Sequence, residues 1–347
     1  MTGPVTLADV ARRAGVSSAT ASRVINGSPK LVHEALRQRV LRAVEELRYV
    51  PNAQARMLAG AERGAIGVIV HDVSDPYFAE ITRGLQRVAM DHRTLLVICN
   101  SYRDPARERE CVELLWAQRV AAIVLAGSGY HDPAATRTLN EALRQYERGG
   151  GRVAVIGRPE LTGDAVLPAN LPGARELGDY LYGLGHRAVG VLAGPKGLTT
   201  TSDRLAGLRR AARAAGATLP PRRIAYTDFT RDGGARAAVA LLDADPNITL
   251  LVAHNDALAI GALATARQRG LRVPEDLSVV GFDDMPVARD VTPALTTVRL
   301  PLEQMGVRAL TLALGEHPGG RAQVETATAE LVVRESTAPP RKGVRPH

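Results

Sequence analysis

Apolar residues recur at helical spacing in two short stretches near the amino terminus, within TLADVARRAGVSSATASRVIN. Thr6 can accept hydrogen bonds from the free N–H groups of a first turn, and Asp9 completes a capping-box-like start, which predicts a helix from about Leu7. Gly15 stands where that helix must end and the chain reverse, and Ser17 supplies the N-cap of a second helix. The pattern is that of a helix-turn-helix.

Helices this short are stable only when they pack together, so their apolar residues should form one small core. The residues expected there are Val10, Ala14, Val16, Ala21, Val24 and Ile25. The second helix then turns a polar side outward, formed by Ser18, Ala19, Thr20, Ser22, Arg23 and Asn26. A third amphipathic helix is predicted from Glu34 to Leu47, with His33 as a weak N-cap. The outward face suits a DNA major groove, and an ordinary surface helical hairpin is the alternative.

After Gly64 the apolar positions change from helical spacing to short continuous runs. The runs AIGVIV, TLLVIC, AAIVLA, RVAVIG, AVGVLA, ITLLVA and LSVVGF alternate with amphipathic helical stretches. Such alternation is typical of an α/β fold with parallel sheets covered on both faces. Ligands bind these sheets at the carboxyl ends of the strands, where this chain has polar or aromatic residues. They are Asp75, Tyr77, Phe78, Asn255, Asp256, Asp283 and Asp284.

Two segments interrupt these patterns. Pro51 disfavours helix in the residue before it, and Asn52 can cap a short segment, AQARMLAG, that ends at Gly60. The last residues, STAPPRKGVRPH, have the composition of a disordered tail, which we expect at residues 336–347. The pattern thus divides the chain into a small all-α piece, a connecting segment, a large α/β region and a tail.

Composition and charge narrow the function classes. A chain of 347 residues, 45% of them hydrophobic, suits two or three globular domains. Residues 1–63 hold ten Lys or Arg and five Asp or Glu, which favours a polyanion partner, with a solvated basic face as the alternative. No run approaches the roughly 20 apolar residues of a membrane span and no signal peptide is evident, so we expect a cytoplasmic protein without a membrane partner. Cys99 and Cys111 are expected to be buried free thiols.

Several motifs, in their order along the chain, resemble those of the lactose/galactose-repressor (LacI/GalR) family of bacterial transcription regulators. TLADVARRAGVSSATASRVING is similar to the family's DNA-binding signature and YVPNAQARMLAG to its hinge, and DPYFAEI, LGHR, DRLAGLRRA, HNDALAIGAL, VPEDLSVVGFDD and PALTTV follow. The resemblance implies a helix-turn-helix headpiece at 1–50, a hinge helix or linker at 51–63, and a two-lobed effector-binding and dimerisation domain at 64–335, like type I periplasmic binding proteins. It also implies a homodimeric repressor that binds a near-palindromic operator in double-stranded DNA.

The resemblance assigns DNA contacts by position. Arg23 is the best candidate for a guanine contact, because its planar fork matches O6 and N7. Leu58 corresponds to the family's leucine that wedges into the minor groove, and an apolar side chain can indeed unstack a base step. We expect the hinge to become helical on DNA, and a plain linker is the alternative. The DNA-binding set is Thr6, Ser17, Ser18, Ala19, Thr20, Ser22, Arg23, Asn26, Asn52, Ala55, Arg56 and Leu58.

The resemblance also implies an effector pocket between the lobes, lined by Asp75, Tyr77, Phe78, Arg204, Phe229, Asn255 and Asp283. Acceptors, a forked donor and flat apolar faces suit a sugar or sugar derivative, although Phe78 could equally be core. The chain departs from its relatives at Arg158, at Ala169 with Asn170, and at Leu198. Many relatives have acidic residues at the first two positions, so an acidic or phosphorylated ligand stays open. Trp116 is expected to be a packing residue.

Other functions fit less well. The eight histidines are scattered, Ser128 lacks the G-x-S-x-G spacing, and GPKGL is not a phosphate-binding loop, so we expect no catalytic residues, metal or cofactor. A transport binding protein has no use for a basic headpiece. A regulator controlled by a non-sugar metabolite or a protein partner, or one without a small ligand, is the alternative to a sugar-responsive repressor.

Overall fold

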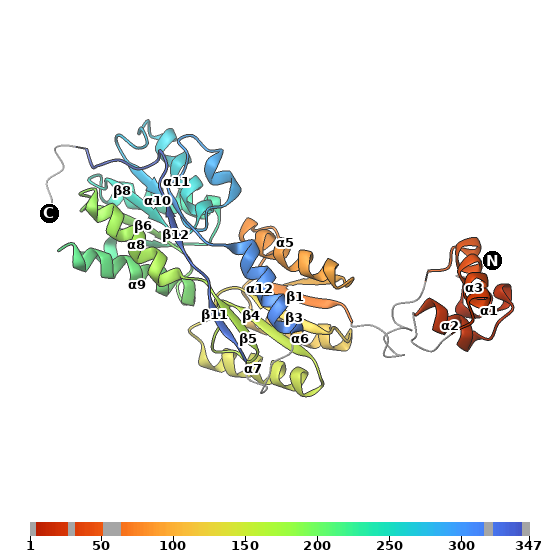
Figure 1. Cartoon of the computed structure of the whole chain (residues 1–347). Coiled ribbons are helices and arrows are strands. Elements are labelled where there is room, and N and C mark those ends of the chain that lie inside the picture. Colours follow the sequence, from red (N-terminus) through yellow and green to blue (C-terminus); the bar gives the residue numbers. More distant parts are fainter. Residues whose placement is uncertain (1–4, 27–31, 51–63, 316–321, 342–347) are drawn as a thin grey trace. The chain divides into compact units, whose positions relative to one another are not determined.

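The computed structural model of the chain describes residues 5–26, 32–50, 64–315 and 322–341 (Figure 1). They belong to two compact units, which divide between Gly64 and Ala65. The residues predicted for the hinge, Asn52, Ala55, Arg56 and Leu58, lie outside the described residues.

The first unit, which we call the headpiece, contains the three predicted helices: α1 (Leu7–Ala14), α2 (Ser18–Ile25) and α3 (Glu34–Leu47). Thr6 and Asp9 form the capping box in both directions, and Gly15 ends α1 in the left-handed conformation at φ 64°. The buried core consists of Val10, Ala11, Ala14, Ala21, Val40 and Ala43, with Val16, Val24 and Ile25 packed against it. Local caps and an amphipathic pattern thus account for this unit.

The first lobe of the second unit has a six-stranded sheet in the order β11-β5-β4-β3-β1-β2, with all neighbours parallel. Its strands are β1 (Ile66–Val70), β2 (Leu96–Asn100), β3 (Ala122–Ala126), β4 (Arg152–Ile156), β5 (Asp164–Leu167) and β11 (Val324–Thr326). The helices are α5 (Pro76–Asp91), α6 (Pro105–Ala117), α7 (Pro133–Arg148) and α12 (Leu302–Leu314). Helices α5 and α12 pack together on one face and α6 and α7 on the other, so both faces of the sheet are covered.

The second lobe has a parallel four-stranded sheet in the order β7-β6-β8-β9. Its strands are β6 (Val189–Ala193), β7 (Ile224–Tyr226), β8 (Leu250–Ala253) and β9 (Ser278–Val280). Helices α8 (Asn170–Gly183) and α9 (Thr199–Ala214) form one packed pair, and α10 (Arg231–Ala244) and α11 (Asp256–Gln268) the other. Two short 3₁₀ turns lie at Pro221–Arg223 and Pro286–Arg289.

The chain passes between the lobes after β5, before α12 and after β11. The short strands β10 (Thr297–Arg299) and β12 (Glu330–Val332) pair antiparallel beside these crossings (Figure 1). Because the connections are several and short, a change in the angle between the lobes must be absorbed at these crossings.

All seven apolar runs are strands, but the pattern did not predict β5, β7, β10, β11 or β12. The expected disordered tail is wrong at its start. Ser336 is fully buried, accepts a hydrogen bond from the N–H of Val279 and donates its hydroxyl to the Val279 carbonyl. Cys111 is buried, whereas Cys99 is half-buried, and both thiols are free. Trp116 packs edge-on against Tyr146, as a packing residue should.

Candidate nucleic-acid interface and ligand pocket

Helix α2 is anchored at its start and open on one side. The Ser17 hydroxyl oxygen accepts a hydrogen bond from the N–H of Thr20 at 3.1 Å, and Ala21 is fully buried in the headpiece core. These two contacts fix how the helix is rotated about its axis. On the opposite side, Ser18, Ala19, Arg23 and Asn26 are exposed and Thr20 and Ser22 are half-buried. We call these six residues the α2 face.

Arg23 has the one cationic side chain of the α2 face. The ion pairs of the described headpiece residues join Arg12 with Asp9, Arg13 with Glu46, and Arg37 with Glu34, and Arg23 takes part in none of them. Its guanidinium is therefore available to a base edge or a phosphate.

The turn before α2 is held by α3. A guanidinium nitrogen of Arg39 donates to the Gly15 carbonyl oxygen at 3.3 Å. A Cβ atom at Gly15 would lie 2.4 Å from that guanidinium, which would have to move, and the left-handed backbone at this position favours glycine. The Thr6 hydroxyl, in turn, donates to Asp9 at 2.6 Å and serves the start of α1.

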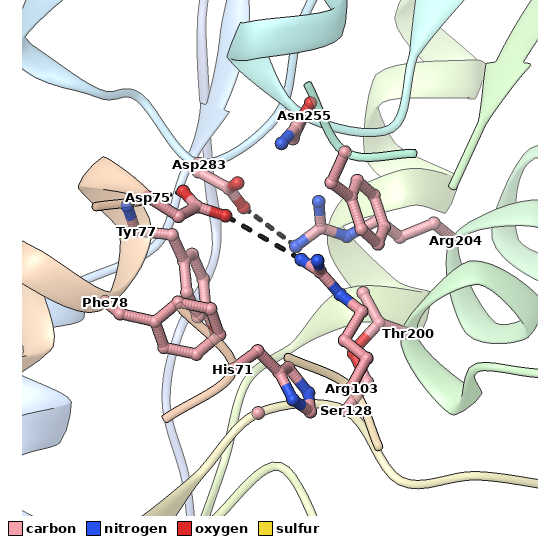
Figure 2. A pocket seen from close by; sticks show the side chains of 12 residues that line it. His71, Asp75, Tyr77, Phe78, Arg103, Ser128, Thr200, Arg204, Asn255 and Asp283 are labelled. Carbon is pink, nitrogen blue, oxygen red and sulfur yellow. Dashed lines mark hydrogen bonds and ion pairs between the residues drawn. The ribbon is translucent and has the colours of Figure 1, made fainter. Parts of the chain in front are cut away.

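A pocket lies between the two lobes of the second unit (Figure 2). All seven residues expected around a cleft line it: Asp75, Tyr77, Phe78, Arg204, Phe229, Asn255 and Asp283. The sequence reading missed five others: His71, Arg103, Gly127, Ser128 and Thr200. The pocket is partly open to solvent, and the space of about 390 Å³ between its lining residues includes part of that solvent.

Two of the pocket's polar side chains also begin helices. Asp75 is the N-cap of α5 and accepts from the N–H of Tyr77 at 3.0 Å. Asn255 is the N-cap of α11 and accepts from the N–H of Leu258 at 2.9 Å. Because both helices follow a parallel strand, their first residues meet at the carboxyl edge of each sheet, and this explains why strand-end residues form the pocket.

Arg204 is the most firmly held side chain of the pocket. Its Nε donates to Asn170 Oδ1 at 2.9 Å, and one Nη donates to the carbonyl oxygen of His254. The other Nη donates to Asp283 Oδ1 at 2.8 Å, and both partners of this ion pair are buried. The guanidinium also lies 3.8 Å from the centre of the Phe282 ring. Its position is therefore set before any ligand binds.

Asp283 combines burial with an unusual backbone. Burial raises the pKa of Asp283 to about 7, even though the adjacent Arg204 guanidinium lowers it. Its φ of 107° lies in the region that favours glycine, where aspartate is tolerated better than most side chains. A strained residue with a shifted pKa in a cleft is typical of a functional site.

Arg103 reaches into the pocket from the loop after β2, also with a left-handed backbone, at φ 60°. A guanidinium nitrogen lies 3.9 Å from Asp75, and the group lies 5.6 Å from the ring centre of Phe229 in the other lobe. Its Nε is buried without a hydrogen-bond partner among the described residues. The rule for strand ends, applied to TLLVICN, could have found Arg103.

A buried polar cluster lies behind the first-lobe wall. Arg158 donates to Glu108 at 2.7 Å and does not line the pocket. His71 lines the pocket, with Nδ1 3.3 Å from the Ser101 hydroxyl. Burial, followed by the charges of Arg103 and Arg158, lowers the pKa of His71 to about 3, so its ring is neutral.

The remaining noted positions are structural. Asp256 accepts from the N–H of Met285 and from the Thr297 hydroxyl, both at 2.6 Å, and Asp284 pairs with two arginines outside the pocket. Leu198 is buried and does not line the pocket. Phe78 belongs to the core and to the pocket: its side chain is 3% exposed, packs in the core and lines the pocket.

The lining can bind a hydroxyl-bearing ring. Carboxylate, guanidinium, amide and hydroxyl groups offer acceptors and donors, and Phe78 and Phe229 offer flat faces. Among the described residues, no three His, Cys, Asp or Glu side chains come together as a metal site needs. Nor does any helix in the described part of the chain combine the length and apolar character of a membrane span.

Two protein-family models match the chain. That of the periplasmic binding protein-like domain matches residues 179–337, and that of the bacterial regulatory proteins of the lacI family matches residues 6–52. The HTH-type transcriptional repressor CytR of Escherichia coli strain K12 is 34% identical over 338 residues, or 96% of each chain. The chain belongs to the LacI family.

Solved structures of LacI-family proteins share its fold. The Lac repressor bound to ONPG in the repressed state has a TM-score of 0.84 at 27% identity, covering 96% of this chain and 100% of that one. The complex of the transcriptional regulator CelR with cellobiose has a TM-score of 0.69 at 32% identity, covering 96% and 99%. This LacI-family protein is a DNA-binding transcriptional regulator, and its relatives are regulators rather than enzymes.

Proposed function

We propose that this LacI-family protein represses transcription as a homodimer bound to a near-palindromic operator, and that a small sugar-like effector in the pocket controls its operator affinity. One observation carries the proposal. The same chain has a free polar face on a capped helix-turn-helix and a pocket lined by side chains from two lobes.

The pocket chemistry supports a hydroxylated effector. The buried Arg204–Asp283 pair and Asn255 can exchange hydrogen bonds with ring hydroxyls, while Phe229 offers a flat apolar face. Relatives of the same fold have been solved with cellobiose and with ONPG. A non-sugar metabolite, a protein partner or no ligand at all is the alternative, and binding measurements on the full chain with a metabolite panel separate these.

The effector would act by changing how the lobes meet. Beside the pocket, the Ser128 hydroxyl donates to Thr200 at 2.7 Å and the N–H of Gly129 donates to Thr199 at 3.0 Å, and both bonds join the lobes. A ligand that bonds to both walls favours one lobe angle over another. A coupling of about 1–3 kcal/mol between effector and operator would be enough for regulation.

On DNA, the α2 face would enter the major groove, with Arg23 donating to a guanine edge. Thr6 and Ser17, which cap α1 and α2, would lie near the sugar-phosphate backbone of the DNA. Asn52, Ala55, Arg56 and Leu58 would occupy the minor groove at the operator centre, with Leu58 as the wedge.

We further propose that the protein acts in the cytoplasm, where operator DNA lies, without catalysis, metal or cofactor. The hydroxyl of Ser128 donates its hydrogen bond to Thr200 and not to a base. Nucleophilic catalysis needs a base within hydrogen-bonding reach of the hydroxyl.

The test is footprinting of genomic fragments that the full chain selects, followed by the same footprint with Leu58→Ala. We expect protection of a near-palindrome with a kinked centre, and weaker binding with less bending for the variant. A protected site without internal symmetry would contradict the dimer, and unchanged bending by Leu58→Ala would contradict the wedge.

A further inference from the structure

The two arginines of the pocket differ in how they are satisfied. Arg204 makes three hydrogen bonds inside the protein, whereas the nearest acidic partner of Arg103 lies 3.9 Å away, beyond hydrogen-bonding distance. The Nε of Arg103 is buried and has no partner among the described residues. Figure 2 shows both guanidinium groups directed into the same part of the pocket. A buried donor left without a partner in the protein is explained when a ligand supplies one.

The wall around Arg103 has a further unpartnered polar atom. His71 is 2% exposed, lines the pocket and has no hydrogen-bond partner for Nε2 among the described residues. The neighbouring α9 begins at Thr199, whose N–H donates to the Gly129 carbonyl oxygen at 3.0 Å, and its N-cap Leu198 offers no side-chain cap. Thr200, in the first turn of this helix, lines the pocket, and helix N-termini attract anions.

Arg103 has a loose ion-pair partner. Oδ2 of Asp75 lies 3.9 Å from its guanidinium, while Oδ1 of the same carboxylate caps α5. Behind the wall, Glu108 is neutralised by Arg158 at 2.7 Å, and Glu160 lies 3.5 Å from the same guanidinium. Neither Glu108 nor Glu160 lines the pocket. The pocket thus holds one buried ion pair that is complete and one guanidinium whose nearest carboxylate among the described residues lies beyond hydrogen-bonding distance.

We propose that the effector carries an anionic group, a carboxylate or a phosphate, which binds the Arg103 guanidinium on the wall formed with His71, Ser128 and Thr200. The hydroxyl-bearing part of the same molecule then faces Arg204, Asp283 and Asn255. The inference rests on the proposed function of this pocket as the effector site. A neutral hydroxyl offers the guanidinium a single uncharged oxygen, whereas a carboxylate or phosphate offers two charged oxygens to its fork.

Arg103 is also the residue through which such an anion would act on the fold. Its guanidinium belongs to the first lobe and lies over Phe229 of the second. An anion that draws the guanidinium toward Ser128 and Thr200 engages both sides of the lobe boundary, because the hydrogen bond between these hydroxyls crosses it.

The first test uses inorganic phosphate alone and the thermal unfolding of the full chain, with sodium chloride at equal ionic strength as the reference. We expect a saturable rise in melting temperature for the wild type that Arg103→Met abolishes. Arg107→Met is the matched control, because it removes the same charge from the exposed face of α6, outside the pocket. A response equal to that of sodium chloride, or an undiminished response in Arg103→Met, overturns the proposal.

The second test compares matched ligands: glucose with glucose 6-phosphate, ribose with ribose 5-phosphate, and galactose with galacturonate. Where a pair binds, the anionic member should bind about tenfold more tightly, and Arg103→Met should remove that difference. Tighter or equal binding of the neutral member overturns the proposal. Arg103→Lys, which keeps the charge without the fork, should retain part of the preference and serves if the methionine variant does not fold.

Operator binding without ligand is measured on the same proteins. If the wild type protects an operator but the phosphate test fails, the proposed repressor is supported and the proposed anionic effector is contradicted. If no operator is protected, the proposed function is contradicted, whatever the result of the phosphate test.

Discussion

The α2 face and the pocket use polar side chains in opposite ways. On the α2 face, Arg23 is exposed and pairs with none of the described residues, whereas in the pocket Arg204 is 3% exposed and makes three hydrogen bonds within the protein. An exposed cation loses little when the partner is absent, because water solvates it. A buried cation must be satisfied by the protein itself. A substitution on the α2 face is therefore expected to change operator affinity, and one at Arg204 to change the free energy of unfolding.

The largest effect is expected from Arg204→Met. Removal of the guanidinium leaves Asp283 buried without its cation and should lower the free energy of unfolding by about 3–5 kcal/mol. Urea denaturation at pH 8 checks this, because the carboxylate is then charged in the wild type. Adding Asp283→Asn should recover part of the loss, since both charges are then gone. If the double variant is as unstable as the single one, the packing of Arg204 on Phe282 matters more than its charge.

The next largest effect is expected in the pH dependence of the free energy of unfolding. His254 is buried with both ring nitrogens unpartnered among the described residues, and burial lowers its pKa to about 3, from an unfolded value near 6.5. The unfolded chain therefore takes up a proton below pH 6.5 that the folded protein does not. Stability from this group is complete above pH 6.5 and is lost as the pH falls toward 3.

We test this with His254→Asn, which cannot take up the proton. Relative to the variant, the wild type should lose about 1.4 kcal/mol of unfolding free energy per pH unit below 6.5. Carboxyl groups with a raised pKa, such as Asp283, contribute to the pH dependence with the opposite sign. Their contribution cancels when the difference between the two proteins is measured. A difference that is constant from pH 7 to pH 5 would contradict a neutral buried His254.

The contrast also separates what sequence can and cannot predict. Both bounds of α1 and the start of α2 were predicted, because Thr6, Gly15 and Ser17 act on neighbours within a few residues. The buried position of Ser336 at the start of the tail was not predicted, because its partner Val279 is 57 residues away in sequence. Strands β10 and β12 were missed because Thr297–Arg299 and Glu330–Val332 include charged or polar residues and form no apolar run.

The pocket was predictable only in part. Asp75 and Asn255 follow apolar strands directly, so the rule for parallel sheets and the family resemblance both point to them. Arg103 follows a strand as well, but nothing local shows that its side chain crosses to Phe229 in the other lobe. That Arg158 turns away from the pocket depends on Glu108, 50 residues earlier in the chain.

On the α2 face, Arg23→Ala should weaken operator binding by about 1–3 kcal/mol and relax specificity at one base pair, with no change in unfolding. Gel-shift titrations against an operator series substituted at each position measure both effects. Arg37→Ala removes the same charge from an exposed position on α3 and is the control. If Arg23→Ala lowers affinity equally for all sequences, Arg23 binds phosphate rather than a base.

The smallest effect is expected from Thr6→Ala, which tests whether the headpiece is independent of the pocket. Loss of the cap on Asp9 should destabilise α1 by about 1 kcal/mol, measured as faster hydrogen exchange of the α1 amides. Thr6→Ser keeps the hydroxyl and should exchange as the wild type does. Because α1 packs against α2 through buried side chains, operator affinity should fall slightly and evenly across sequences. A loss confined to particular base pairs would instead make Thr6 a direct DNA contact, and effector binding should stay unchanged in either case.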